Sequence, residues 1–173
     1  MLVKQINITM EIGILSRPSK EYFDEMFRIS KSAIIFGGNF FADLLPLGTH
    51  WVVWDKKGDV KFQNPYSDCE LIWTNIKKNT IKKITFRQQG FITDSKDKRV
   101  HPTQKPSELI EQLLKLYTKE NDIICDPFAG SGTTGIACLN TNRNYILMEK
   151  EPKYYEIILE RIKNHVIQGK MEG

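Results

Sequence analysis

The residues with the clearest chemical signature form a glycine-rich turn between an apolar run and a helical pattern. The run 122–125 predicts a strand, and it leads directly into Asp126 and the Gly-Ser-Gly turn at 130–132. Glycine permits positive φ and close approach, so such a turn brings backbone N–H groups near a ligand. Open α/β sheets leave a ligand crevice at the carboxyl ends of their strands. The turn therefore predicts a site for a nucleotide-like ligand, with an ordinary tight crossover as the alternative.

Two acidic residues indicate which ligand fits. Glu149 ends the next expected strand, 145–148, where a carboxylate can accept hydrogen bonds from two ribose hydroxyls. Asp126 would repel a pyrophosphate, and the turn lacks the phasing of dinucleotide sites and the Gly-Lys-Ser/Thr of phosphate-binding loops. S-adenosylmethionine, which carries an amino group and a sulfonium, fits better. It is the expected cofactor, and a nucleotide-dependent oxidoreductase is the weaker alternative.

The composition restricts the class of protein. The length of 173 residues, with 40% hydrophobic and 27% charged residues, predicts a single soluble domain, 1–173. No apolar run approaches the ~18 residues of a membrane span, and no signal peptide is evident, so we expect a cytoplasmic protein without a membrane partner. Cys69, Cys125 and Cys138 show no metal-ligand spacing; we expect no metal, no disulfide, and three small buried side chains. The net charge of +4 is compatible with a polyanion partner.

The elements that must position the turn alternate between strand and helix. Apolar runs and helical spacing in the C-terminal third give strand, helix, strand, helix, which is typical of a mostly parallel sheet flanked by helices. Pro106 fits the first turn of one helix. Residues 75–99 predict a loop-rich insert. The expected strands are 33–36, 51–54, 70–74, 83–86, 122–125 and 145–148, and the expected helices include 19–30, 109–117 and 133–140, with a further helix lined by Tyr155, Ile158, Leu159 and Ile162.

Several segments together resemble a known family. His-Pro-Thr-Gln-Lys-Pro at 101–106 and Asp-Pro-Phe-Ala-Gly-Ser-Gly-Thr-Thr at 126–134 resemble the cofactor motifs of DNA amino-methyltransferases, and Glu149 resembles their ribose-binding acid. Segments 36–41 and 67–74 look like parts of the catalytic half. The chain is most similar to the permuted group, in which the cofactor-binding half comes last.

This resemblance implies a Rossmann-like methyltransferase fold and methyl transfer from S-adenosylmethionine to an exocyclic amine of double-stranded DNA, with adenine N6 preferred over cytosine N4. The target base would be flipped out of the duplex. The resemblance also implies a role in restriction-modification. The residues expected to line the cofactor site are His101, Thr103, Lys105, Asp126, Phe128, Ala129, Gly130, Ser131, Gly132, Thr133 and Glu149.

Several of these residues have a plainer alternative. His101 could simply begin a turn, Lys105 could be solvated instead of pairing with a cofactor carboxylate, and Phe128 could pack in the core. The insert could contact DNA phosphates or be a solvated loop. Its basic residues are Lys82, Lys83, Arg87, Lys96, Lys98 and Arg99.

The family's catalytic tetrapeptide, Asp/Asn/Ser-Pro-Pro-aromatic, does not occur in the sequence. It is expected upstream of helix 19–30, and the near match at 64–66 lies on the wrong side of the strands at 36 and 51, so no catalytic residue is assigned. Either the chain is truncated, with a sheet incomplete at the N-terminus, or it is a short form that binds cofactor or DNA, as a homodimer or paired with an intact methyltransferase. We expect 2–8 to fill the central sheet position, as a poor central strand because of Lys4 and Gln5.

Overall fold

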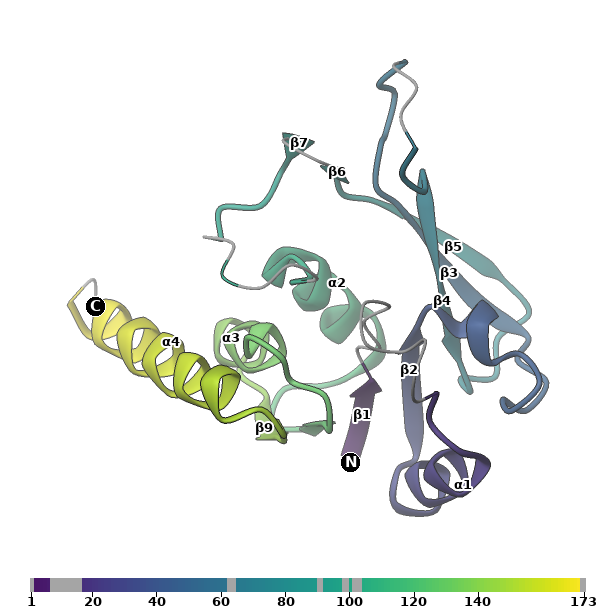
Figure 1. Ribbon diagram of the computed structural model, residues 1–173, viewed down its shortest axis with the longest axis horizontal. Coiled ribbons are helices and arrows are strands. Elements are labelled where there is room, and N and C mark those ends of the chain that lie inside the picture. The colour runs from purple at the N-terminus through teal and green to yellow at the C-terminus, as the bar shows by residue number, and fades with distance from the viewer. Residues whose placement is uncertain are drawn as a thin grey trace.

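The protein is an α/β structure with one seven-stranded sheet (Figure 1). The computed structural model describes residues 2–6, 17–61, 65–89, 92–97, 100 and 104–171. The strands are β1 Leu2–Ile6, β2 Ser32–Phe36, β3 His50–Asp55, β4 Cys69–Thr74, β5 Ile81–Thr85, β6 Gln88–Gln89, β7 Ile92–Thr93, β8 Ile123–Asp126 and β9 Asn144–Leu147. The helices are α1 Lys20–Ile29, α2 Ser107–Tyr117, α3 Thr133–Asn140 and α4 Pro152–Met171, with a 3-10 turn η1 at Gly38–Phe41.

The strand order in the large sheet is β5-β3-β4-β2-β1-β8-β9. Every neighbouring pair is parallel except the two that involve β4, which runs antiparallel to β2 and β3. The predicted mostly parallel sheet is therefore confirmed. The parallel connections place the carboxyl ends of β2, β1, β8 and β9 along one edge, where α/β folds hold their ligands.

Strand β1 occupies the centre of this sheet. It pairs in parallel with β2, where Val3 is opposite Ser32, and with β8, where Val3 is opposite Ile124. Backbone groups on both sides of β1 therefore enter ladders, and neither β2 nor β8 is left as an open edge. The expectation that the N-terminal segment fills the central position is confirmed for Leu2–Ile6, and the expected gap in the sheet is absent among the described strands. Residues 7 and 8 lie outside the described residues.

The two faces of the sheet are covered by different helices. Alternation along β2 sends Ile34 into one buried cluster and Ile35 into another. The first cluster contains the apolar face of α2 and two residues of α3; the second contains Phe23 and Met26 of α1. Figure 1 shows α2, α3 and α4 grouped together and α1 apart from them, beside β2. The glycine-rich loop after β8 thus lies beside α3 and α4, whereas α1 lies on the β2 side of the sheet.

Some local expectations need correction. Pro106 is the N-cap of α2, with extended backbone angles (φ −63°, ψ 135°), because its missing N–H suits a position before the first helical turn. The insert contains β5 and the β6–β7 hairpin and is less irregular than expected. Among the α4 side chains whose burial the structure describes, 152–168, only Ile158 is buried, whereas Tyr155 and Leu159 are about half exposed.

The cysteines and helices have two further properties. Cys125 and Cys138 are buried, but Cys69 is exposed because it begins β4 at the rim of the sheet, which corrects the expectation for that residue. None of the helices in the described ranges combines the length and apolar character of a membrane span.

Candidate cofactor site

The glycine turn follows β8 and is tied to the neighbouring strand end. The N–H of Ala129 donates to the carbonyl of Met148 at 2.9 Å, and the N–H of Met148 donates to the carbonyl of Asp126 at 2.9 Å. The N–H of Gly132 closes the turn on the carbonyl of Ala129 at 2.8 Å. The loop after β8 and the residues after β9 therefore form one rigid corner at the carboxyl edge of the sheet.

Asp126 begins this loop and is completely buried. Its Oδ2 accepts a hydrogen bond from the Thr134 hydroxyl at 2.6 Å, and its Oδ1 accepts one from the N–H of Phe128 at 3.0 Å. Burial raises the pKa of Asp126 to about 7, and these two hydrogen bonds act in the opposite direction. Oδ2 thus ties the start of α3 to the end of β8, and Oδ1 holds the loop residue Phe128, so Asp126 acts first as the anchor of the loop.

Glu149 lies where the sequence predicts an acid beside the loop. Its Oε2 accepts a hydrogen bond from the N–H of Gly130 at 2.8 Å, and its Oε1 accepts one from the N–H of Glu151 at 2.9 Å. The side chain is half-buried. The structure therefore brings Glu149 and the glycine turn together, with a carboxylate at the edge of the loop.

The two glycines of the turn have different surroundings. Gly130 (φ +55°) and Gly132 (φ +80°) both adopt left-handed angles that glycine accommodates without strain. A Cβ on Gly132 would lie 3.0 Å from Ile158 Cγ1, whereas a Cβ on Gly130 would meet nothing within 4 Å. The loop is therefore packed closely on α4 at Gly132 and faces open space at Gly130, where a ligand can approach the backbone.

Phe128 lies at the surface of the loop instead of in the core. Its side chain is 39% exposed, and its ring lies 5.4 Å from the ring of Tyr22 on α1. The core-packing alternative is therefore wrong for Phe128. The neighbouring Ala129 and Thr133 are buried, so only their backbone could meet a ligand at the turn.

Lys105 has a partner that the sequence did not indicate. Its Nζ lies 2.7 Å from Glu70 Oε1 and 3.0 Å from Oε2, and it stands 5.2 Å from the centre of the Phe36 ring. The Lys105 side chain is only 11% exposed, so the solvated alternative is wrong. Aromatic rings shield this ammonium from water, and a shielded cation requires a nearby anion. The structure thus pairs Lys105 with Glu70, whereas the sequence suggested a cofactor carboxylate.

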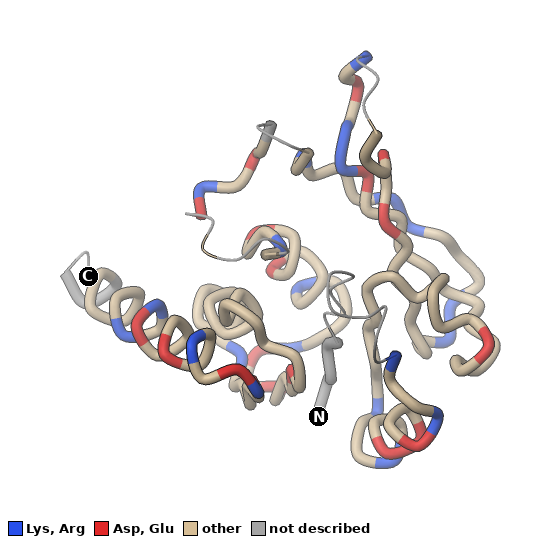
Figure 2. The backbone as a smooth tube through the Cα atoms, in the orientation of Figure 1, with Lys and Arg blue, Asp and Glu red and all other residues tan. Residues whose placement is uncertain are grey.

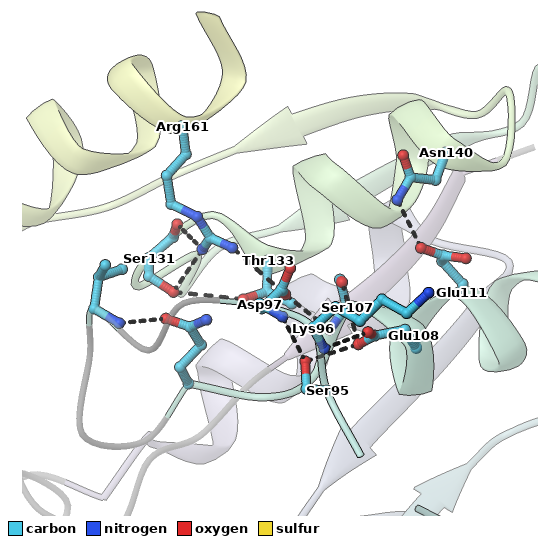
Figure 3. Close-up of polar contacts among 12 residues, drawn as sticks. Ser95, Lys96, Asp97, Ser107, Glu108, Glu111, Ser131, Thr133, Asn140 and Arg161 are labelled. Atoms are coloured by element: carbon cyan, nitrogen blue, oxygen red, sulfur yellow. Dashed lines mark hydrogen bonds and ion pairs between the residues drawn. The ribbon is translucent and has the colours of Figure 1, made fainter. Parts of the chain in front are cut away.

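A guanidinium from α4 completes the loop (Figure 3). Arg161 Nη1 donates to the Ser131 carbonyl at 2.7 Å and to Ser131 Oγ at 3.1 Å, and Nη2 lies 3.6 Å from Asp97 Oδ2. Burial lowers the pKa of Arg161, and the charge of Asp97 opposes that shift. Sequence reasoning missed this residue, because nothing in the spacing of α4 distinguishes Arg161 from a surface arginine.

Segment 95–97 is fastened to the start of α2 by the same network. Glu108 accepts hydrogen bonds from the Ser95 hydroxyl and the Lys96 N–H, both at 2.9 Å, and Asp97 accepts one from the Ser107 N–H at 3.2 Å. Figure 3 shows these groups converging below Arg161. The insert, α2, α4 and the glycine turn are therefore joined by one set of polar contacts.

The basic residues of the insert are partly neutralised within the protein. Lys83 pairs with Asp55 at 2.8 Å, and Arg87 pairs with Asp94 at 2.7 Å. Figure 2 shows basic and acidic positions interspersed along the backbone of this region. Lys83 and Arg87 are therefore already paired with carboxylates, and a DNA phosphate would have to compete with those carboxylates for them.

Some expected site residues lie outside the described part of the chain. These are His101 and Thr103 of the cofactor segment, Lys98 and Arg99 of the insert, and Asn64 of the rejected near match. The family's tetrapeptide is expected upstream of α1, and most of that stretch, residues 7–16, also lies outside the described part of the chain. Within the described ranges, no three His, Cys, Asp or Glu side chains form a group that could hold a metal ion.

The sheet order, the glycine turn and the acid after the next strand define a Rossmann-like protein with a nucleoside-type ligand loop. The chain belongs to the N6/N4 DNA methylase family, which it matches over residues 18–160. It is 34% identical over 123 residues to the type II methyltransferase M2.LlaDCHI of Lactococcus lactis subsp. cremoris, covering 70% of this chain and 44% of that relative. It is 34% identical over 117 residues to M2.DpnII of Streptococcus pneumoniae, covering 66% of this chain and 42% of that relative.

Solved structures show the same fold. The crystal structure of an M1.HpyAVI-SAM complex superposes with a TM-score of 0.66 at 24% identity, covering 93% of this chain and 87% of that chain. The cytosine-N4-specific PvuII DNA methyltransferase gives a TM-score of 0.59 at 17% identity, covering 95% and 83%. The matched sequence thus spans less than half the length of the two curated relatives, whereas the fold covers most of each solved chain.

Proposed function

We propose that the chain binds S-adenosylmethionine at the glycine turn and serves DNA methylation at an exocyclic amine, with adenine N6 as the preferred target and cytosine N4 as the alternative. The observation that carries this proposal is the corner formed by Gly130 and Glu149, where open space lies beside a backbone N–H and a carboxylate. The sulfonium of the bound cofactor would supply an activated methyl group.

The residues of this chain would position the cofactor for the reaction. Glu149 would accept hydrogen bonds from ribose hydroxyls at the edge of the turn, and Phe128 would cover an apolar part of the ligand. Asp126 keeps the loop in place through Thr134. Methyl transfer to a weakly nucleophilic amine depends on such positioning, because the amine must meet the methyl group in line with the departing sulfur.

Titration calorimetry with S-adenosylmethionine and with NAD tests the first part of this proposal. We expect binding of the former and none of the latter. Transfer of labelled methyl groups to unmethylated duplex DNA, followed by nucleoside analysis, then tests the reaction and separates adenine from cytosine. Failure to bind S-adenosylmethionine overturns the proposal.

A second candidate is a binding module without catalysis that acts in the cytoplasm beside an intact methyltransferase or as a homodimer. The absence of the family's tetrapeptide from the sequence favours it. Half-exposed apolar residues on α4 and the adjacent edge, including Tyr155, Leu159 and Ile146, support pairing with another chain. Cofactor binding without methyl transfer, together with a dimeric mass in light scattering, would favour this candidate over the first.

A further inference from the structure

The hydroxyl of Tyr22 is a buried polar group that lacks a hydrogen-bond partner among the described residues. The ring of Tyr22 is well packed, with the Phe23 ring edge-on at 5.6 Å and the Phe128 ring at 5.4 Å. Buried hydroxyls almost always have a partner, because desolvating one without a hydrogen bond is costly. An orphan hydroxyl in an otherwise packed residue therefore requires an explanation.

The position of this hydroxyl connects it with the cofactor loop. Burial raises the pKa of Tyr22 well above its ordinary value, and the charges of Asp126 and Cys125 add to this shift. Asp126 and Cys125 end β8, so the hydroxyl lies near the start of the loop although Tyr22 belongs to α1. The phenol is protonated at neutral pH, so its hydroxyl can donate a hydrogen bond.

We propose that Tyr22 is a ligand-contact residue of the methyl-donor site, whose hydroxyl donates a hydrogen bond to an acceptor atom of S-adenosylmethionine. Its ring and that of Phe128 form an aromatic wall that joins the cofactor loop to α1. This inference rests on the proposed function and assigns a ligand contact to α1, in addition to those of the glycine turn. The orphan hydroxyl is the group that the ligand satisfies.

This role predicts opposite effects on stability and on binding. Tyr22→Phe keeps the ring and its contacts and removes only the hydroxyl. In the free protein the variant loses an unsatisfied group, so its midpoint of thermal unfolding is expected to stay the same or rise by about 2–4 °C. In the complex it loses one hydrogen bond, so the Kd for S-adenosylmethionine is expected to rise about five- to tenfold. A hydroxyl with a merely structural role would lower the unfolding midpoint and leave the Kd unchanged.

The experiment compares wild type, Tyr22→Phe and Tyr155→Phe by calorimetry with S-adenosylmethionine and by thermal unfolding without ligand. Tyr155 lies on α4 and is 49% exposed, so its variant controls for loss of a phenolic hydroxyl and should match wild type in both measurements. Equal Kd values for wild type and Tyr22→Phe overturn this inference while leaving the proposed function standing. A wild-type protein that does not bind S-adenosylmethionine overturns both.

Discussion

Arg161 holds Ser131 by two oxygens at once, at 2.7 Å to the carbonyl and 3.1 Å to the hydroxyl. The two residues stand on different elements, α4 and the glycine turn. The same guanidinium reaches Asp97 in the insert at 3.6 Å. One planar cation therefore fixes the middle of the cofactor loop relative to two other parts of the chain, which arginine does better than lysine because its donors form a rigid fork.

Replacement of Arg161 should weaken cofactor binding. Arg161→Ala leaves the buried Ser131 without its partner, so we expect the free energy of unfolding to fall by about 1–3 kcal/mol and S-adenosylmethionine affinity to fall about tenfold. Arg161→Lys keeps the charge but not the fork, and it should show a smaller loss. Calorimetry and urea unfolding measure both quantities. Arg28→Ala, on the exposed surface of α1, is the control and should change neither. An unchanged affinity in Arg161→Ala would show that the loop holds its shape without α4.

The free energy of unfolding should depend on pH through the ionisation of Asp126. Its pKa rises from 3.8 to about 7 on folding, so the folded state binds the proton more tightly than the unfolded chain. This contribution is fully present below about pH 4 and is lost as the pH rises from about 4 to 7. Urea unfolding across that range should therefore show a decline in wild type that is absent from Asp126→Asn. Parallel pH profiles for the two proteins would contradict the assignment.

Asp55 provides a comparison of opposite sign. The hydrogen bond from Lys83 is the largest cause that lowers the pKa of Asp55 to about 2. A lowered pKa stabilises the folded state above about pH 4, and this contribution is lost as the pH falls toward 2. Asp55→Asn should therefore differ most from wild type above pH 4 and approach it in acid. Because the Asp55 and Lys83 pair lies at the surface, the expected difference is small.

The two glycines of the turn should respond differently to alanine. Both have positive φ, so each substitution strains the backbone by about 1–2 kcal/mol. Gly132→Ala additionally presses on Ile158 and should destabilise the protein further. Gly130→Ala adds a methyl group to open space, so its main effect should be weaker S-adenosylmethionine binding. Thermal unfolding and calorimetry on the pair separate packing from ligand approach. A larger loss of stability in Gly130→Ala would reverse this assignment.

The pair formed by Lys105 and Glu70 should behave as a unit. Lys105→Met leaves the Glu70 carboxylate half-buried without its cation, and we expect a loss of about 2–4 kcal/mol. Lys105→Met combined with Glu70→Gln should recover part of this loss. A double-mutant cycle by urea unfolding measures the coupling. Additive losses of stability would mean that the two side chains have no coupling free energy.

The sequence predicts local features of this protein well and distant contacts poorly. The glycine turn, Glu149 and the alternation of strands and helices depend on neighbouring residues and on periodicity, so they could be recognised in advance. The contact of Arg161 with Ser131, and that of Lys105 with Glu70, join residues far apart in the chain. No local pattern marks such pairs, because only the packed structure decides which charges become shielded and need each other.

The position of β1 has a consequence for how the protein assembles. Leu2 pairs with Ile123, so the centre of the sheet joins two segments that lie far apart in the chain. Contacts of such long range form slowly, because a large loop must close before they contribute. Until β8 has left the ribosome, the edge of β1 that faces β8 has no partner strand, whereas β2 can already pair with β1 and β4. Unpaired edges invite association with other chains. Productive folding of this protein is therefore a matter of timing during translation as well as of final stability.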